Sequence, residues 1–379
     1  MEDKITAAAR HFEELLRQQL ARQARLAGSA EAKDFSCVGK IVIGLVDGDG
    51  IGPIIMREAR RAAEKLLRDE IGSGRVELRD ISGLTIENRM ACGTSVPAEV
   101  LGQIKACDVL LKGPTTTPKG GSLESANVTL RRELDLYANV RPVCVPEEGI
   151  DWIFFRENTE GEYALGSSGI ELDGALSMDF KVTTDAGTRR IARAAFDYAR
   201  ANGKSSVAIV TKANIMKKTD GMFSRIAHEI AADYPEIETE DWYIDIMTAN
   251  LVNPAVRSRF QVFLLPNLYG DIITDEAAQI QGGVGTAGSA NIGGRYAMFE
   301  AVHGSAPRKI ANGEGDYANP ASILKALELL LRHIALTEKA DRLAEALRLC
   351  TETERRVVVT GHRDGATCRA FGDYLLEKL

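Results

Sequence analysis

A short apolar run, followed directly by a glycine-rich turn and an amphipathic segment, constrains the fold of this chain most strongly. Residues 41–46 read IVIGLV, and residues 48–53 read GDGIGP. From Ile54 to Glu70, apolar residues recur at the spacing of one helix face. Strand, glycine turn and helix in this order form one unit of a parallel sheet. The stretch therefore predicts an α/β fold, in which ligands gather at the carboxyl ends of the strands.

Further strands and helices are expected along the chain. Apolar runs predict strands at 76–81, 109–111, 152–155, 207–210, 261–265 and 298–302, and one that passes through Trp242 and ends at Asp245. Helical spacing predicts helices at 4–27, 184–202, 220–232 and 277–281, with more from Pro320 onward. Residues 164–182 are interpreted as loop and short strands that form an arm.

The composition fits a globular protein and argues against several functional classes. With 379 residues, of which 45% are hydrophobic and 27% charged, the chain is long enough for two domains or one large α/β unit. The net charge of -7 argues against general nucleic-acid binding. The six cysteines form no CxxC pair, which favours reduced thiols. No apolar run is long enough to span a membrane and no targeting peptide is recognisable, so we expect a cytoplasmic protein.

Residues 125–141, SANVTLRRELDLYANVR, concentrate groups that bind carboxylates. Arg131 and Arg141 carry planar guanidinium groups, which pair with carboxylates at two points and stay charged. Ser125 and Asn127 add small hydrogen-bonding side chains. The stretch therefore favours a small substrate with several carboxylates. The alternative is an amphipathic helix whose surface arginines pair with the acidic side chains of the same segment, Glu133 and Asp135.

Asp271 and Asp275 lie four residues apart at the expected start of a helix, so they share one face. Paired carboxylates suit Mg2+ or Mn2+, and Asp245 could complete the metal site. The alternative is capping of the helix N-terminus, which explains Asp271 but not Asp275. Lys212 and Tyr163 each follow a strand end, where they could take part in acid–base chemistry.

Residues 283–288 match the dinucleotide-binding pattern G-x-G-x-x-G, but their surroundings do not fit it. That pattern requires a strand before it and a helix after it. Here a helix is expected before it and an irregular segment after it, so the glycines are interpreted as a flexible loop. A Rossmann domain is therefore not expected. The loop HGSAP at 303–307 could wrap a nucleotide, although a lone histidine is usually structural.

Seven motifs together resemble the β-decarboxylating dehydrogenases, which include isocitrate, homoisocitrate, 3-isopropylmalate and tartrate dehydrogenases. In chain order they are GDGIGP, KGPTTTP, S-x-NVTLR-x9-R, FRENTEGEY, TKANIMK, NLYGDIITD and EAVHGSAP. The resemblance covers residues 40–340 or so and leaves the start of the chain outside it. It implies an α/β fold with a mixed parallel and antiparallel sheet in place of a Rossmann domain.

The resemblance also implies the domain organisation and the assembly. The segment 1–35 lies outside the resemblance, and its helical spacing is interpreted as an appended N-terminal helix. A large cofactor-binding domain would consist of 36–135 and 286–379, and a small domain of 136–285 would carry an arm at about 161–185 that clasps a second subunit. We expect a homodimer or a higher homo-oligomer with shared active sites, and no nucleic-acid or membrane partner.

By position in the motifs, the resemblance assigns a role to each candidate site residue. The substrate carboxylates would be bound by Arg131, Arg141 and Arg156, with Ser125 and Asn127 facing the part of the substrate that differs within the family. Mg2+ or Mn2+ would be bound by Asp245, Asp271 and Asp275, of which Asp245 comes from the partner subunit. Lys212, also from the partner, would help take the proton from the C2 hydroxyl, and Tyr163 would protonate the enol left after CO2 departs. The cofactor would be bound by Thr116, Thr117, Asn214, Glu300, His303, Gly304, Ser305, Ala306, Pro307, Arg308, Lys309 and Asn319.

Substrate and cofactor are narrowed further by individual residues. Ser125 and Asn127 can hydrogen-bond a carboxylate where isopropylmalate enzymes place aliphatic groups, so isocitrate fits better than homoisocitrate or 3-isopropylmalate. Arg308 and Lys309 stand where NAD-using relatives carry an acidic residue, which leans toward NADP. NAD stays open because of two acidic residues further along the loop, Glu314 and Asp316. A non-catalytic regulatory subunit is a weaker alternative, since no metal-binding or acid–base residue is missing.

Overall fold

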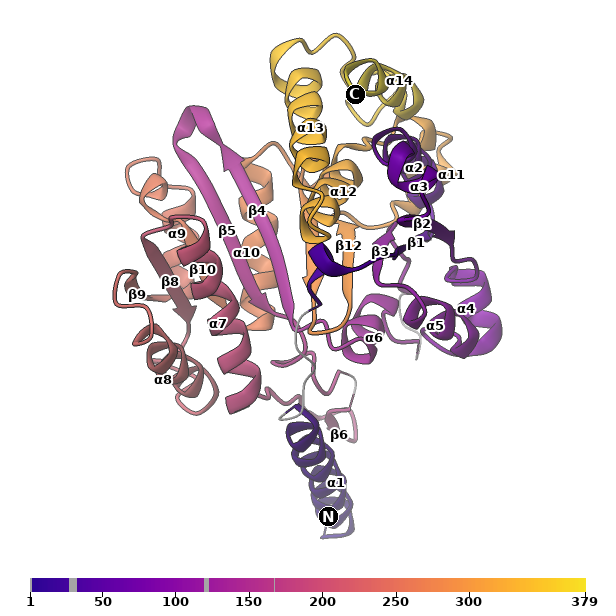
Figure 1. Cartoon of the computed structure of the whole chain (residues 1–379). Helices are drawn as coiled ribbons and strands as arrows, with labels where there is room; N and C mark the ends of the chain where they lie inside the picture. The colour runs from indigo at the N-terminus through magenta and orange to yellow at the C-terminus, as the bar shows by residue number, and fades with distance from the viewer. Residues whose placement is uncertain (1, 27–32, 119–122, 167) are drawn as a thin grey trace. The chain divides into compact units, whose positions relative to one another are not determined.

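The computed structural model describes residues 2–26, 33–118, 123–166 and 168–379. They form two compact units, each with its own strands and helices (Figure 1). Unit 1 consists of Met1–Glu31 and Tyr137–Ala277, and unit 2 of Ala32–Leu136 and Ala278–Leu379. Parts of the expected N-terminal segment (27–32) and of the expected arm (167) lie outside the described residues.

The strands of unit 2 follow the order β2-β1-β3-β12-β11. β1 (Ile41–Val46) pairs in parallel with β2 (Val76–Asp80) and with β3 (Val109–Lys112). β12 (Ala297–Ala301) pairs in parallel with β3 and antiparallel with β11 (Gly288–Ile292). All residues of β3 and β12 are buried, including the charged Lys112 and Glu300, and the other residues of both strands are apolar.

Helices follow the strands of unit 2, as the first strand–turn–helix unit predicts. α2 (Gly52–Leu66) has a proline in its first turn, where the fixed φ of proline suits a helix start, and its buried face is apolar apart from Glu58. Leu67 separates it from α3 (Arg68–Gly72), so the single helix expected at 54–70 is two helices. The other helices are α4 (Ile86–Cys92), α5 (Ala98–Lys105), α6 (Ala126–Glu133), α11 (Pro307–Ala311), α12 (Ala321–His333), α13 (Thr337–Arg348) and α14 (Cys368–Lys378).

The strands of unit 1 follow the order β4-β5-β10-β8-β9. β4 (Ala138–Val145) is antiparallel to β5 (Ile150–Glu157), while β10 (Val262–Leu265), β8 (Ser206–Thr211) and β9 (Glu238–Tyr243) continue in parallel. Stacked rings of Phe154 and Phe263, with centroids 4.3 Å apart, pack in its core. The sheet arrangement of each unit is thus mixed, as expected.

The helices of unit 1 include one that precedes all the motifs. α1 (Glu2–Leu26), which we expected to be an addition to the body, is grouped with this unit. The others are α7 (Asp185–Ala201), α8 (Thr219–Ala231), α9 (Ile244–Leu251) and α10 (Asn267–Ile280). In the expected arm, β6 (Ile170–Leu172) and β7 (Leu176–Met178) form an antiparallel pair.

Two further local expectations are wrong, and one strand was not expected. Asp245 does not end a strand, because β9 stops at Tyr243 and Asp245 lies in the first turn of α9. Residues 288–292 are not irregular: they form β11, whose polar side chains Ser289 and Asn291 are buried. Burial of polar side chains hid this strand from a search for apolar runs. β4 was missed as well, because it follows directly on the helical pattern around Arg131.

No helix in the described part of the chain is both long and apolar enough to cross a membrane.

Candidate active site

Three loops of unit 2 that carry predicted motifs contact one another through their backbones. The amide of Asp49 donates to the carbonyl of Pro114 at 2.7 Å, and the amide of Ile51 donates to the carbonyl of Ser305 at 3.0 Å. Gly50 has a φ of +60°, and a Cβ there would lie 2.0 Å from the Ser305 carbonyl oxygen. Glycine is therefore required for the GDGIGP loop to approach the HGSAP loop this closely.

Side chains complete this loop cluster. The Asp49 carboxylate accepts hydrogen bonds from the amides of Ile86 and Thr116, each at 2.7 Å. The hydroxyls of Thr116 and Ser305 lie 2.7 Å apart, within hydrogen-bond distance. The fully buried Arg89, which the motifs did not identify, donates to the carbonyls of Ser95, Thr116 and Glu124. Because a guanidinium presents several donors in a fixed plane, Arg89 holds the hydroxyl-rich loop KGPTTTP (112–118) in one conformation.

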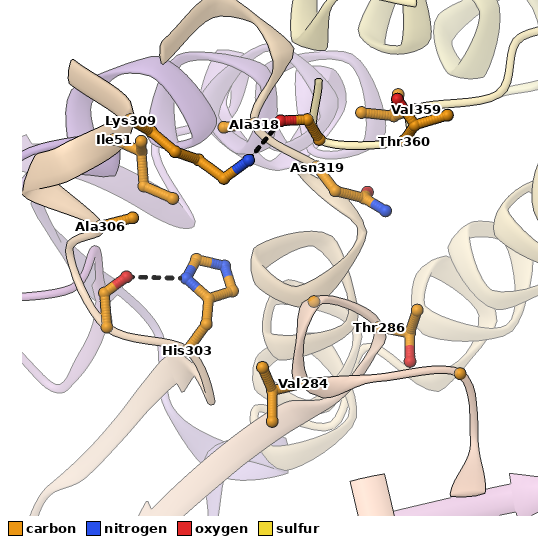
Figure 2. A pocket seen from close by; sticks show the side chains of 14 residues that line it. Ile51, Val284, Thr286, His303, Ala306, Lys309, Ala318, Asn319, Val359 and Thr360 are labelled. Atoms are coloured by element: carbon orange, nitrogen blue, oxygen red, sulfur yellow. Dashed lines mark hydrogen bonds between the residues drawn. The ribbon is translucent and has the colours of Figure 1, made fainter. Parts of the chain in front are cut away.

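A cavity of about 530 Å³ lies beside the HGSAP loop of unit 2 (Figure 2). Its lining includes five residues with a predicted cofactor role: His303, Gly304, Ala306, Lys309 and Asn319. The rest of the wall comes from Ile51, Ala318 and the segments around 282–286 and 359–361. A cavity of this size and composition suits a large part of a nucleotide.

His303 and Lys309 give this cavity its polar character. His303 Nδ1 lies 3.0 Å from the carbonyl oxygen of Gly304. Burial lowers the pKa of His303 below its ordinary value, although this hydrogen bond raises it slightly, so the imidazole is neutral at pH 7. The Lys309 ammonium donates to the carbonyl of Gly361, which ties the HGSAP loop to the C-terminal segment (Figure 2). The cavity wall therefore contains one cationic group and one neutral ring.

The other predicted cofactor residues lie outside this lining. Ser305 is buried in the loop cluster with Thr116, while Thr117, Pro307 and Arg308 are exposed. Asn214 is exposed in unit 1. Conversely, the G-x-G-x-x-G segment, which we interpreted only as a flexible loop, contributes Val284, Gly285 and Thr286 to the wall. The structure agrees with the prediction that these glycines form no Rossmann turn, since β11 rather than a helix follows them.

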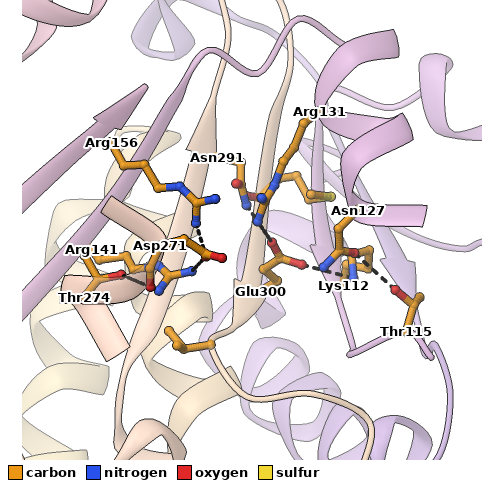
Figure 3. Close-up of polar contacts among 12 residues, drawn as sticks. Lys112, Thr115, Asn127, Arg131, Arg141, Arg156, Asp271, Thr274, Asn291 and Glu300 are labelled. Carbon is orange, nitrogen blue, oxygen red and sulfur yellow. Dashed lines mark hydrogen bonds and ion pairs between the residues drawn. The ribbon is translucent and has the colours of Figure 1, made fainter. Parts of the chain in front are cut away.

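Glu300 lies at the centre of a buried ionic network in unit 2 (Figure 3). One carboxylate oxygen pairs with Lys112 Nζ at 3.0 Å, and the other accepts from Asn291 at 2.9 Å and from Arg131 at 3.4 Å. Burial alone would raise the pKa of Glu300, but the two cations outweigh it and hold the pKa at about 2. The predicted cofactor residue Glu300 thus has both oxygens engaged by neighbouring side chains.

Arg131 and Arg141, the two arginines predicted to bind substrate in residues 125–141, are not surface groups of one helix. Arg131 is on α6 and Arg141 on β4, and both are buried. Neither forms the expected alternative pair with Glu133, which contacts Lys105 at 3.3 Å. Ser125 directly precedes α6, and the side-chain oxygen of Asn127 accepts from the hydroxyl of Thr115 at 3.1 Å.

In unit 1, the predicted substrate arginines Arg141 and Arg156 contact carboxylates of α10 (Figure 3). Arg141 donates to Asp275 at 3.1 Å and to Thr274 at 2.6 Å. Arg156 donates to Asp271 and, through two nitrogens, to the side-chain oxygen of Asn267. At the adjacent position 270, a Cβ would lie 2.5 Å from Cγ of Arg156, so glycine lets this arginine lie flat on α10. These contacts fix both guanidinium groups in place.

Lys212 directly follows β8, as predicted, and pairs with Asp245 at 2.6 Å. The hydrogen bond from Lys212 lowers the pKa of Asp245, so the carboxylate is ionised at neutral pH. The backbone amide of Lys212 donates to the buried Asp220 at 2.8 Å, and Asp220 also pairs with the buried Lys181 at 2.6 Å. The ion pair of Asp220 and Lys181 therefore anchors the loop that carries Lys212.

The carboxylates predicted to bind a metal ion fit that role in part. Asp271 and Asp275 supply hard oxygen donors from one face of α10, and their side chains are 42% and 62% exposed. Asp245, 67% exposed, faces Lys212 instead. Within the described ranges, no group of three or more acidic, histidine or cysteine side chains is placed to hold a metal ion. One chain thus offers a two-carboxylate half-site.

The sequence profile described as isocitrate/isopropylmalate dehydrogenase matches residues 42–374. The chain therefore belongs to this family, and the predicted resemblance is confirmed. Isocitrate dehydrogenase from Methylococcus capsulatus, a solved structure, is 36% identical and superimposes with a TM-score of 0.79 over 89% of this chain and 99% of that one. This similarity confirms the α/β fold with mixed strand directions.

Curated relatives carry three different names. An NAD isocitrate dehydrogenase subunit 2 of Schizosaccharomyces pombe mitochondria is 37% identical, over 82% of this chain and 80% of the relative. An isocitrate dehydrogenase [NADP] of Rickettsia felis is 41% identical, over 80% of this chain and 62% of the relative. A chloroplastic 3-isopropylmalate dehydrogenase of Solanum tuberosum is 42% identical, over 80% and 83%. Sequence identity therefore does not separate the two substrates or the two cofactors.

Proposed function

We propose that the protein catalyses the oxidative decarboxylation of isocitrate to 2-oxoglutarate and CO2, with reduction of NADP or NAD. The observation that supports this most is the chemistry of residues 125–131. Ser125 and Asn127 offer polar side chains on the same segment as the buried Arg131. A third carboxylate on the substrate suits this polar segment, whereas an isopropyl group would leave its hydrogen-bonding groups without partners.

In this proposal, Arg131, Arg141 and Arg156 bind the substrate carboxylates and set its orientation. Each is already held by a carboxylate of the protein, Glu300, Asp275 and Asp271 respectively, so each guanidinium is fixed before substrate arrives. A fixed donor costs less entropy on binding than a free side chain. The buried network of Glu300 supports Arg131 in this way, which makes Glu300 a positioning residue and not a cofactor ligand.

Acid–base roles fall to Lys212 and Tyr163. Lys212 would help take the proton of the C2 hydroxyl. NADP or NAD, held by the residues that line the cavity of unit 2, would accept the hydride from C2. Loss of CO2 leaves an enol, which Tyr163 protonates at carbon. A Mg2+ or Mn2+ ion held by Asp271, Asp275 and Asp245 would withdraw charge from the substrate oxygens. Asp245 and Lys212 serve the site of a second copy of the chain, which agrees with the two-carboxylate half-site of α10.

For the cofactor, we propose a preference for NADP. Lys309 lines the cavity, whereas Glu314 and Asp316, which could accept from an unmodified ribose, do not. Glu314 also faces His362, with 3.7 Å between the Glu314 Oε2 and His362 Nδ1 atoms. A cationic wall favours a ligand with an additional phosphate.

Product analysis tests the proposed reaction. In the presence of Mg2+, the purified chain should convert isocitrate and NADP into 2-oxoglutarate, CO2 and NADPH in equal amounts. Absence of 2-oxoglutarate with both cofactors would refute it. The 42% identity to a 3-isopropylmalate dehydrogenase makes that substrate the second candidate, which the same assay addresses. Activity of the chain alone would also exclude a purely regulatory subunit.

A further inference from the structure

The loop between Arg156 and Tyr163 contains two buried carboxylates, Glu157 and Glu160, each 3% exposed. Glu157 accepts from the amides of Thr159 and Glu160, at 2.9 Å and 2.6 Å, and from the Thr159 hydroxyl at 2.8 Å. The pKa of Glu157 is raised to about 7, mainly by burial and secondly by the negative charge of the nearby Glu160. Two acidic groups this close and this buried need positive charge around them.

Part of that charge comes from the N-terminal helix. Arg22 of α1 donates to the Glu160 carboxylate at 3.1 Å and to the Thr159 hydroxyl at 3.1 Å. The same hydroxyl accepts from Arg190 of α7 at 3.0 Å. The Arg22 side chain is only 15% exposed, so water screens the contact little.

Glu160 is held tightly on its other side. It accepts from the amide of Thr184 at 2.9 Å and from its hydroxyl at 2.5 Å. Opposite, at position 187, a Cβ would lie 2.3 Å from the carboxylate, so the start of α7 is shaped around this side chain. The Glu160 carboxylate therefore cannot move aside if Arg22 is lost.

α1 lies outside the residues that the family profile matches, which begin at 42. It nevertheless packs on the rest of unit 1. Leu15 is buried, and the rings of Phe12 and Phe180 lie 5.3 Å apart between centroids. His11 Nε2 lies 2.9 Å from the carbonyl oxygen of Ser168. These contacts place Arg22 beside the Arg156–Tyr163 loop.

We propose that α1 acts as a latch, which means that it holds the Arg156–Tyr163 loop in place. Arg22 is then a positioning residue, which keeps Arg156 and Tyr163 in their working geometry by neutralising Glu160. The proposal rests on the function proposed above for those two residues. Arg22 touches neither substrate nor cofactor: it acts through the loop. Without Arg22, the two buried acidic side chains lose one of the cations that neutralise them, and the loop loosens to let water reach them.

A matched pair of variants on α1 tests this inference. Arg22→Met removes the buried contact, whereas Arg17→Met removes an exposed pair with Glu13 one turn away on the same helix. Hydrogen–deuterium exchange of amides 157–163 should become about tenfold faster in Arg22→Met and stay within about twofold of wild type in Arg17→Met. This readout does not require turnover, so it stands even if the proposed reaction is wrong. Unchanged exchange in Arg22→Met would overturn the latch.

Kinetics and a rescue variant separate positioning from general destabilisation. In Arg22→Met, KM for isocitrate should rise about fivefold or more, because the substrate must bind to a displaced Arg156. The value of kcat should fall less, because saturating substrate returns Arg156 to its position. Arg22→Lys should recover part of this effect. Adding Glu160→Gln to Arg22→Met removes the uncompensated charge and should return the exchange of 157–163 toward wild type. A double variant no better than Arg22→Met would contradict the charge argument.

Discussion

The Tyr163 hydroxyl donates to Asp271 at 2.8 Å, and the other carboxylate oxygen of Asp271 accepts from Arg156. The carboxylate of Asp271, a proposed metal ligand, is thus shared by a proposed proton donor and a proposed substrate-binding arginine. Their motifs, FRENTEGEY and NLYGDIITD, are about a hundred residues apart in sequence, and β5 and α10 bring them together. Within unit 1, Asp271 therefore links the proposed proton donor to a proposed substrate-binding arginine.

Tyr163→Phe tests the acid–base assignment. Removal of a positioned proton donor typically lowers the rate by about 10²–10⁴-fold, so kcat should fall by that order while KM for isocitrate changes little. Steady-state kinetics measure both. As a control, Tyr317→Phe changes a tyrosine of unit 2 without a proposed role and should leave kcat unaltered. If Tyr163→Phe retains full kcat, another group protonates the enol.

Mixing of inactive variants tests the shared site. If Lys212 and Asp245 serve the site of a second copy, then Lys212→Met and Tyr163→Phe subunits should complement each other. In a mixed dimer, one of the two sites combines both wild-type groups. Mixed samples should regain a measurable part of wild-type kcat. Failure to regain activity in dimers shown to be mixed would place both groups in the site of a single chain.

Cofactor preference follows from the cavity wall. A charge-assisted contact to a phosphate contributes about 1.5–3 kcal/mol, and each ~1.4 kcal/mol is a factor of about ten in affinity. We therefore expect kcat/KM for NADP to exceed that for NAD by about tenfold or more, and the double variant Arg308→Asp, Lys309→Ile to lose most of this preference. Lys325→Ile, which changes a lysine outside the lining, is the control. A wild-type preference for NAD would contradict the proposal.

Acid should weaken unit 2 through Glu300. Its folded pKa of about 2 lies below the ordinary value of 4.5, so its stabilising contribution is fully present above about pH 4.5 and is lost as pH falls toward 2. The shift corresponds to roughly 3 kcal/mol. Glu300→Gln should therefore lower the free energy of unfolding strongly at pH 7 and by roughly half as much at pH 3. Denaturant titrations at both pH values measure this, and an equal loss at both would show that Glu300 contributes no pH-dependent stability.

Some of this architecture is predictable from the sequence because the responsible groups are local. Gly50 and Gly270 occupy positions where a Cβ would collide with a neighbouring loop or side chain, so the glycine-rich motifs directly report close backbone approach. Arg131 and Arg141, on either side of a helix–strand junction, could be recognised from the motif but not separated into α6 and β4.

Other parts depend on contacts that no local pattern shows. Glu300 reads as a cofactor residue in its motif, and only the fold reveals Lys112 and Asn291 on its carboxylate. Arg89 supports the hydroxyl-rich loop from an element without a motif. The latch formed by Arg22 joins residues 138 positions apart, between a segment outside the family profile and one inside it. Such long-range ionic contacts follow from tertiary structure and leave no spacing in the sequence.

The central claim is the identity of the substrate, and competition between family substrates tests it most directly. The purified chain is assayed with isocitrate, homoisocitrate and 3-isopropylmalate, each with Mg2+ and with NADP or NAD, and the absorbance of the reduced nicotinamide is followed. Because Ser125 and Asn127 offer hydrogen bonds that an isopropyl group cannot use, kcat/KM for isocitrate should exceed that for 3-isopropylmalate by about a hundredfold or more. A preference for 3-isopropylmalate or homoisocitrate, or no turnover of isocitrate with either cofactor, would contradict the account.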